Sequence, residues 1–328
     1  MKKLKLIFLL IGVFTTFLAF SQSENYFSAF EGRHFYKPFI SEISSTLSHV
    51  DVGVATDIKK KDSPVDKVFT EVHLGADIPL LYQERGKMKW ALSLPVSFHM
   101  LWNTFEETTA PIINNDYRFG LSFTGISYFQ NSFIKNISYK ITPLAHESTH
   151  LGDEISIYGI QNIDNFYRVN VSYEYYELGL TINDPDTLTS NLLSVRLGFM
   201  GLLNPENDYY TISENEVNDK VIYPTERWAE YYININYTKT SGFLTSKNWH
   251  PSFSVELRNR VYYQYEREGK NDRGWGINAF IGYEYVPKRA KGIKSVGHYF
   301  RYYNGINPHG QLRNRDYTFY GYSIVLFY

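Results

Sequence analysis

The chain of 328 residues contains no cysteine, carries almost no net charge, and beyond its first residues has no long apolar run. Without cysteine, disulfide bonds and thiolate metal sites are excluded, so packing and backbone pairing must hold the fold together. A membrane-spanning helix needs about 18 or more consecutive apolar residues, so no such helix is expected after the N-terminal segment. The formal net charge of −1 gives no reason to expect nucleic acid as a partner.

The N-terminal segment is the one apolar run in the sequence. Three lysines precede an apolar stretch from Leu6 to Phe20, and the small residues Ala19 and Ser21 lie just before Gln22. Basic residues, a short apolar region and small residues at a cleavage position are typical of a secretory signal peptide. We therefore expect residues 1–21 to be a cleaved signal peptide and the protein to be exported.

Strict alternation of apolar and polar residues dominates the remainder of the chain. In the segment WAEYYININY, Tyr231, Ile233 and Ile235 fall on one parity, whereas Glu230 and Asn234 fall on the other. Successive side chains of a strand point to opposite faces, so this pattern predicts a strand with one apolar and one polar face. About twelve such segments are found, near 45–57, 67–82, 88–101, 116–129, 132–147, 165–182, 191–202, 227–239, 250–265, 274–287, 293–304 and 316–328.

Aromatic content and the end of the sequence decide between a soluble sandwich and a membrane barrel. The chain has 29 tyrosines and 23 phenylalanines, which is typical of barrels with aromatic girdles at the membrane interfaces. Its final segment, YTFYGYSIVLFY, places aromatic and aliphatic residues on one face and ends on Tyr328. A last strand that ends on an aromatic residue resembles the assembly signal of bacterial outer-membrane barrels.

The predicted fold is therefore all-β: a transmembrane antiparallel up-and-down β-barrel of about twelve strands. We expect the signal peptide at 1–21, an N-terminal periplasmic segment at 22–43 and the barrel at 44–328, in the outer membrane of a Gram-negative bacterium. Expected partners are outer-membrane lipid, lipopolysaccharide and, during insertion, the barrel-assembly machinery. The oligomeric state does not follow from the sequence.

Charged residues of both signs fall on the polar face of most predicted strands, among them Glu256, Arg258, Arg260 and Arg301. In a membrane barrel this face lines the lumen. Two interpretations are open: the charges pair across a narrow lumen as a structural network, or they form a selective pore for small solutes.

The motif HESTH spells H-E-x-x-H, which on a helix makes a zinc peptidase site. Here it follows a predicted strand, on which His146 and His150 lie about 13 Å apart and cannot share one ion. If no bulge interrupts the strand, His146, Ser148 and His150 continue its polar, lumen-facing row, which comprises Asn136, Ser138, Lys140 and Thr142.

His146 and Ser148 also form H-x-S, which resembles the paired His and Ser of the outer-membrane phospholipase A family, a twelve-strand barrel. The resemblance implies His146 as base, Ser148 as nucleophile and an Asn downstream, for which Asn162 and Asn165 are loose matches. In that family the pair faces lipid, whereas alternation here predicts the lumen. Calcium is expected only if this resemblance holds; otherwise no cofactor and no metal is expected.

Three blocks, FYKPFISEISS, HESTHLGDE and YYNGINPHGQL, resemble those of an uncharacterised family of bacterial outer-membrane proteins. They lie near the start, middle and end of the exported chain. This resemblance implies an outer-membrane barrel and no established catalytic residues.

Topology brings two of these blocks to one end of the barrel. With both termini in the periplasm, the loops that carry His150, Asp153, Glu154, His309 and Gln311 meet at the outer mouth. They form either a small polar site, with a cation held by His150, Asp153 and His309, or a set of caps that fasten two loops together.

The sequence thus favours a non-enzymatic outer-membrane barrel of unknown activity, with a plugged or narrow polar lumen and a polar site at its extracellular mouth. The alternatives are a phospholipase-like lipid hydrolase that uses His146, Ser148 and Asn165, and a small-solute channel.

Overall fold

The structure is a computed structural model that describes most of the chain. The described residues are 26–29, 35–56, 67–104, 112–130, 133–151, 168–185, 191, 193–203, 209–212, 220–221, 229–261, 273–287, 294–310 and 316–327.

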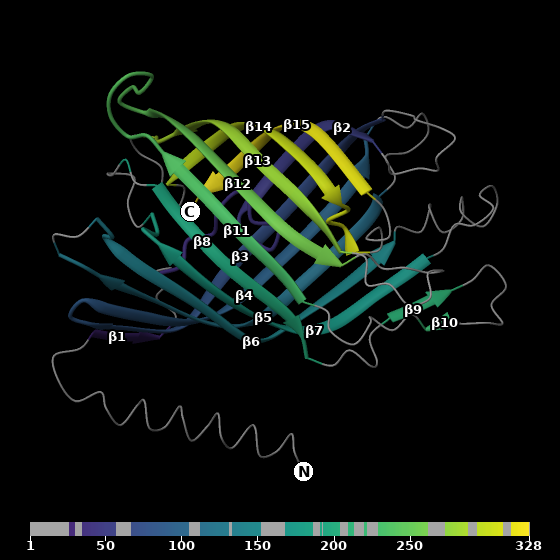
Figure 1. The fold of residues 1–328 in the computed structure, drawn as a ribbon, viewed down its shortest axis with the longest axis horizontal. Helices are drawn as coiled ribbons and strands as arrows, with labels where there is room; N and C mark the ends of the chain where they lie inside the picture. Colours follow the sequence, from purple (N-terminus) through teal and green to yellow (C-terminus); the bar gives the residue numbers. More distant parts are fainter. Residues whose placement is uncertain are drawn as a thin grey trace, which may run out of the picture.

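Twelve antiparallel strands form a closed barrel, which confirms the predicted fold (Figure 1). Each strand pairs with the next along the chain, and the pairing of β15 with β2 closes the ring. The barrel strands are β2 (Ser48–Thr56), β3 (Lys67–Arg85), β4 (Met88–Asn103), β5 (Ile112–Tyr128), β6 (Asn136–Leu151), β7 (Arg168–Ile182), β8 (Leu193–Leu202), β11 (Ala229–Thr238), β12 (Trp249–Val261), β13 (Arg273–Tyr285), β14 (Ser295–Ile306) and β15 (Asp316–Phe327).

Three short strands lie beside this ring. β1 (Tyr26–Ala29) pairs with β3, β9 (Tyr209–Ile212) pairs with β7, and β10 (Lys220–Val221) pairs with β9. Among the described residues, no helix is long and apolar enough to span a membrane.

The two faces of the barrel wall have inverted polarity. Aliphatic side chains such as Leu74, Leu197 and Ile281 are exposed on the outer face, whereas Glu71, Arg196 and other ionised side chains are buried within the barrel. A soluble sandwich would bury the first set and expose the second. The inversion matches a barrel whose outer face contacts lipid.

The two ends of the barrel differ in their connections. Tight connections, such as the β3–β4 turn at Gly86 with its positive φ of 56°, lie at the end where β2 begins and β15 finishes. β2, β6 and β14 finish at the opposite end, and each is separated from the next barrel strand by nine or more residues, so this end is called here the long-loop end.

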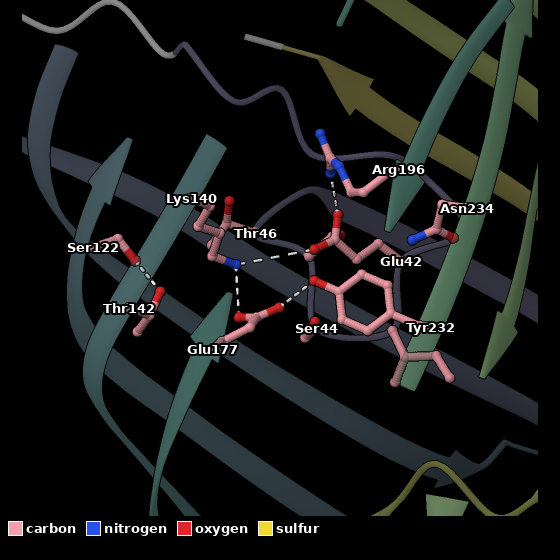
Figure 2. A network of polar contacts seen from close by, with 12 residues as sticks. Glu42, Ser44, Thr46, Ser122, Lys140, Thr142, Glu177, Arg196, Tyr232 and Asn234 are labelled. Atoms are coloured by element: carbon pink, nitrogen blue, oxygen red, sulfur yellow. Dashed lines mark hydrogen bonds and ion pairs between the residues drawn. The ribbon is translucent and has the colours of Figure 1, made fainter. Parts of the chain in front are cut away.

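Residues 35–47 lie inside the barrel as a plug. Glu42 of the plug accepts a hydrogen bond from Arg196 of β8 at 2.5 Å, and Lys140 of β6 lies 4.0 Å from its other oxygen (Figure 2). Lys140 also pairs with Glu177 of β7 at 2.8 Å. The plug is therefore joined through buried charge to β6 and β8, the two strands that flank β7.

Backbone contacts hold the plug as well. Asn278 donates to the carbonyl of Ser41 at 2.9 Å, and Arg118 donates to the carbonyl of Ile43 at 3.0 Å. Residues 35–43 belong to the segment expected in the periplasm, and the structure places them inside the barrel. They can lie there because their polar groups find partners on the inner wall.

A bulge in β6 determines which way the HESTH segment faces. Between the pairs Leu121↔Leu144 and Phe123↔Ile141, one residue of β5 opposes two residues of β6, and β7 shows an equivalent shift against β6. The extra residue lies next to Pro143, which cannot donate a backbone hydrogen bond to a neighbouring strand. An extra residue reverses the parity of every residue after it.

The prediction that His146, Ser148 and His150 face the lumen is therefore wrong. Thr142 is buried, but beyond the bulge the buried residues are Ala145, Glu147 and Thr149. The two histidines and Ser148 lie on the outer face. Glu174 of β7 also lies on the outer face, where its side chain is 42% exposed beside His146.

We expect Glu42→Ala to destabilise the protein by about 3 kcal/mol, because it removes the nearest carboxylate of the buried Arg196 guanidinium and, among the described residues, leaves only Asp184, at 3.5 Å, to compensate it. Urea unfolding in detergent micelles measures the change. Glu84→Ala, which removes a half-buried partner of Lys89 at 3.0 Å, is the matched control and should cost no more than about 1 kcal/mol. Equal losses in the two variants would contradict a structural role for the plug.

The direction of the HESTH segment can be measured directly, because every introduced cysteine would be unique in this chain. A nitroxide on Ser148→Cys in lipid bilayers is expected to be relaxed by dissolved oxygen more than by a water-soluble nickel chelate. Leu144→Cys, also on the exposed outer face, is the positive control. A Ser148→Cys label that responds mainly to the chelate would contradict the bulge.

Candidate functional site

The HESTH segment is extended, as predicted, and forms the end of β6. His146 and His150 therefore lie four strand residues apart and do not converge on one ion. The zinc-peptidase arrangement, which needs a helix, is excluded for this segment.

Ser148 and His150 form a pair on the outer face. The Oγ atom of Ser148 lies 3.2 Å from Nε2 of His150, within hydrogen-bonding distance. Residues i and i+2 of a strand share a face, which brings the two side chains together. A hydroxyl beside an imidazole nitrogen is the arrangement that activates a nucleophile.

His146 lies on the same face but makes a different contact. Its Nδ1 atom is 3.4 Å from Glu174 on β7, and its ring packs on Phe119 with the ring centroids 5.2 Å apart. The described residues therefore pair Ser148 with His150, whereas the resemblance to phospholipase A implied His146 as the base.

Aromatic side chains lie beside the pair on the outer face. Tyr117 lies opposite Ser148 in the β5–β6 register, and its ring meets His150 edge-on with the centroids 5.7 Å apart. Phe98 packs on Tyr117 at 4.8 Å, and Phe119 is 57% exposed. The Ser148–His150 pair thus sits in an apolar outer surface near the long-loop end.

Asn115 of β5 lies directly opposite His150 in the register. Opposed residues of neighbouring strands share a face. The Oδ1 atom of Asn115 is buried and has no hydrogen-bond partner. It is an acceptor that a protonated ring nitrogen of His150 could use. Asn165, the third residue implied by the resemblance, lies outside the described residues.

The residues predicted as a lumen charge network belong to two separate groups. In the first, Arg258 donates to Glu256 at 2.7 Å and to Glu230 at 3.0 Å, and Arg260 donates to Glu230 at 3.0 Å. Every member is at most 2% exposed. Paired buried charges of this kind are costly to break, because removal of one partner leaves the other uncompensated.

Arg301 belongs to the second group, near the long-loop end. It donates to Glu71 at 2.7 Å and also to Asp51. Glu71 further accepts from His99 at 3.1 Å and from Tyr317 at 2.6 Å. These side chains come from β2, β3, β4, β14 and β15.

His309, from the connection after β14, enters this second group. Its Nε2 atom is 3.6 Å from Glu71 and its Nδ1 atom is 3.8 Å from Asp116 of β5, and the side chain is fully buried. Burial alone would lower the pKa of His309, but the carboxylates of Asp116 and Glu71 outweigh it and raise this pKa above its ordinary value.

The structure separates two residues that the sequence grouped at the mouth. His150 is exposed on the outer face, whereas His309 is buried inside the barrel. They lie on opposite sides of the wall because the bulge turned His150 outward. Asp153, Glu154 and Gln311 lie outside the described residues.

His99 and Asp116 were not among the candidate residues from the sequence. His99 lies on the polar parity of its strand, which was a signal that it faces the lumen. The proximity of His99 to His309 depends on the path of the connection after β14, which folds back into the barrel. Alternation along the strands does not predict that path.

No protein-family model and no curated protein matches this sequence. Solved structures of outer-membrane barrels are similar to it. Outer membrane phospholipase A from Escherichia coli is 12% identical, with a TM-score of 0.46 over 90% of this chain and 93% of that chain.

The Salmonella typhi outer membrane phospholipase dimer with bound calcium is also 12% identical, with a TM-score of 0.46 over 90% of this chain and 94% of that chain. The translocator domain of the autotransporter NalP from Neisseria meningitidis is 8% identical, with a TM-score of 0.36 over 86% of this chain and 87% of that chain. What these proteins have in common with this chain is the barrel.

Proposed function

We propose that this protein is an outer-membrane β-barrel that hydrolyses carboxyl esters of membrane lipids, with Ser148 as nucleophile and His150 as general base. The observation that carries the proposal is the Ser148–His150 contact of 3.2 Å on the apolar outer face. The sequence favoured a non-enzymatic barrel because it placed Ser148 in the lumen. The Ser148 side chain instead lies on the outer face, which is the only face that a membrane-lipid ester reaches. This placement favours the hydrolase over the non-enzymatic barrel.

The contact supports a two-step reaction. Oγ of Ser148 attacks the ester carbonyl while Nε2 of His150 takes the hydroxyl proton, and the same nitrogen then protonates the departing lipid alkoxide. Water, deprotonated by His150, cleaves the acyl-serine, releases a fatty acid and restores the serine.

Asn115 is the residue that would orient His150. For Nε2 to accept the serine proton, the neutral ring must carry its own proton on Nδ1. The unpartnered Oδ1 of Asn115, on the opposed residue of β5, is an acceptor for that proton. Such a contact fixes the tautomer and stabilises the imidazolium that forms during the reaction.

The proposed location is the outer membrane, and outer-membrane phospholipid and lipopolysaccharide are the proposed lipid contacts. The inverted wall supports this placement, because exposed aliphatic residues surround a charged interior. Barrel-assembly machinery is the proposed partner during insertion. Calcium is a candidate cofactor only for the hydrolase, so activity should be assayed with calcium and with chelator.

A barrel without enzymatic activity is the second candidate. The plug and its buried ion pairs favour it, because they fill the lumen with structural contacts. The small-solute channel is less well supported, since residues 35–47 occupy the space through which a solute would pass.

Ser148→Ala is expected to abolish fatty-acid release from phospholipid in mixed micelles, because it removes the attacking oxygen. Titration of released fatty acid measures the rate. Ser127→Ala, on the same strand pair but towards the opposite end of the barrel, is the matched control and should retain the activity. Unchanged hydrolysis by the Ser148→Ala variant would remove the proposed function.

His150→Gln is expected to lower the rate by about 10²–10⁴-fold, the usual contribution of a positioned general base. His146→Gln should lower it by less than about tenfold, because His146 contacts Glu174 and not Ser148. The same lipid assay separates the two variants. The opposite ranking would assign the base to His146 and contradict the role of His150.

A further inference from the structure

We propose that the barrel binds one divalent transition-metal ion inside its wall, through Glu71 of β3, His99 of β4 and His309 of the connection after β14. This site lies on the inner side of the wall and is independent of the proposed hydrolase. One ligand atom from each of the three residues lies within 4.8 Å of the others, and all three residues are buried.

The first support for a metal site is that the buried imidazole of His309 makes no hydrogen bond. The side chain is fully buried, yet neither ring nitrogen makes a hydrogen bond. The distances of 3.6 Å to Glu71 and 3.8 Å to Asp116 are too long for one. Buried polar groups without a partner are rare in folded proteins, so a ring with two of them calls for a ligand.

The spacing suits a metal ion. In a tetrahedral site with bonds of about 2.0–2.2 Å, neighbouring ligand atoms are about 3.4 Å apart. Nε2 of His309 and Oε1 of Glu71 are separated by 3.6 Å, close to that value. Nε2 of His99 and Oε2 of Glu71 are separated by 3.1 Å. A small movement of the imidazoles would complete the coordination.

The surroundings hold the ligands in position. Arg301 and Tyr317 hold the Glu71 carboxylate at 2.7 and 2.6 Å. One oxygen of Asp116 accepts from Thr149 at 2.8 Å and from the backbone of Gly310 at 3.1 Å, and its other oxygen faces Nδ1 of His309 without a hydrogen bond. A carboxylate behind a metal-bound imidazole is the usual support for such a ligand.

Charge in the group also favours a cation. Asp51, Glu71 and Asp116 are carboxylates, and Arg301 is the guanidinium that pairs with the first two. Buried charge is expensive unless it is compensated, so the group has room for further positive charge. Besides Arg301, the imidazoles of His49 and His99 lie 3.1 Å from Asp51 and Glu71, and a metal ion bound by Glu71, His99 and His309 would add positive charge to this group.

The donor set indicates the class of metal. Two imidazoles and one carboxylate suit zinc and other first-row divalent ions. Calcium and magnesium prefer oxygen ligands alone and are not expected here. Bound metal would fasten the connection after β14 to β3 and β4 and so close the long-loop end of the barrel.

The test uses the full exported chain without a polyhistidine tag, stripped with EDTA in detergent and dialysed against Zn²⁺. Mass spectrometry of the metal is expected to find one zinc per chain, and the Tm is expected to rise by roughly 5–10 °C. His99→Ala and His309→Ala should lose both effects. His298→Ala, whose ring contacts Tyr322 on the outer face, is the matched control and should keep both.

Two further variants keep the outcome decisive. If His309→Ala fails to fold, His309→Gln retains size and polarity and should fold without binding zinc. Ser148→Ala should bind zinc like the unaltered protein, which separates this proposal from the hydrolase. No zinc uptake by the unaltered protein, or uptake retained in the His99 and His309 variants, overturns the proposal and leaves His309 as a buried neighbour of two carboxylates.

Discussion

The structure depends on the compensation of ionised side chains inside a barrel whose outer face is apolar. An ionised side chain inside this wall is not hydrated by bulk water, so it needs an ion-pair or hydrogen-bond partner within the barrel. Arg258 and Arg260 meet Glu230 from neighbouring strands, and Arg196 meets Glu42 of the plug. The plug is part of this arrangement, because it supplies carboxylate and backbone oxygens that the inner wall alone lacks. Compensation is incomplete at His309, whose two buried ring nitrogens make no hydrogen bond.

A single extra residue beside Pro143 decides the chemistry of the outer face. Without it, Ser148 and His150 would join the buried polar row, and Glu147 and Thr149 would face outward. With it, Glu147 pairs with Arg118 at 2.9 Å inside, and Ser148 meets His150 outside. A central strand tolerates proline poorly, because proline has no backbone N–H to donate to the neighbouring strand. The bulge accommodates Pro143, and it reverses the direction of every side chain that follows it in β6.

The outer Ser148–His150 pair lies beside one part of the buried group that surrounds His309, because β5 and β6 contribute residues to both. On β6, Thr149 faces inward to Asp116, while its neighbours Ser148 and His150 face outward. On β5, Asp116 faces inward and Asn115 faces outward. Contacts made by the inner residues therefore fix the backbone that presents the outer ones. Rigid strands hold the side chains of a catalytic pair in a more precise geometry than a loop would.

The sequence alone determined the closed antiparallel barrel, its twelve strands and the polarity of its two faces, because strict alternation persists over nearly every strand. Arg258, Arg260 and Arg301 were placed inside by parity for that reason. Parity could not place His146, Ser148 and His150, since one bulge reverses it and its position depends on pairing with two neighbouring strands. The entry of residues 35–47 into the lumen, and the meeting of His309 with Glu71 and His99, were decided only by the tertiary structure. Both join residues far apart in the chain through connections that carry no periodic signal.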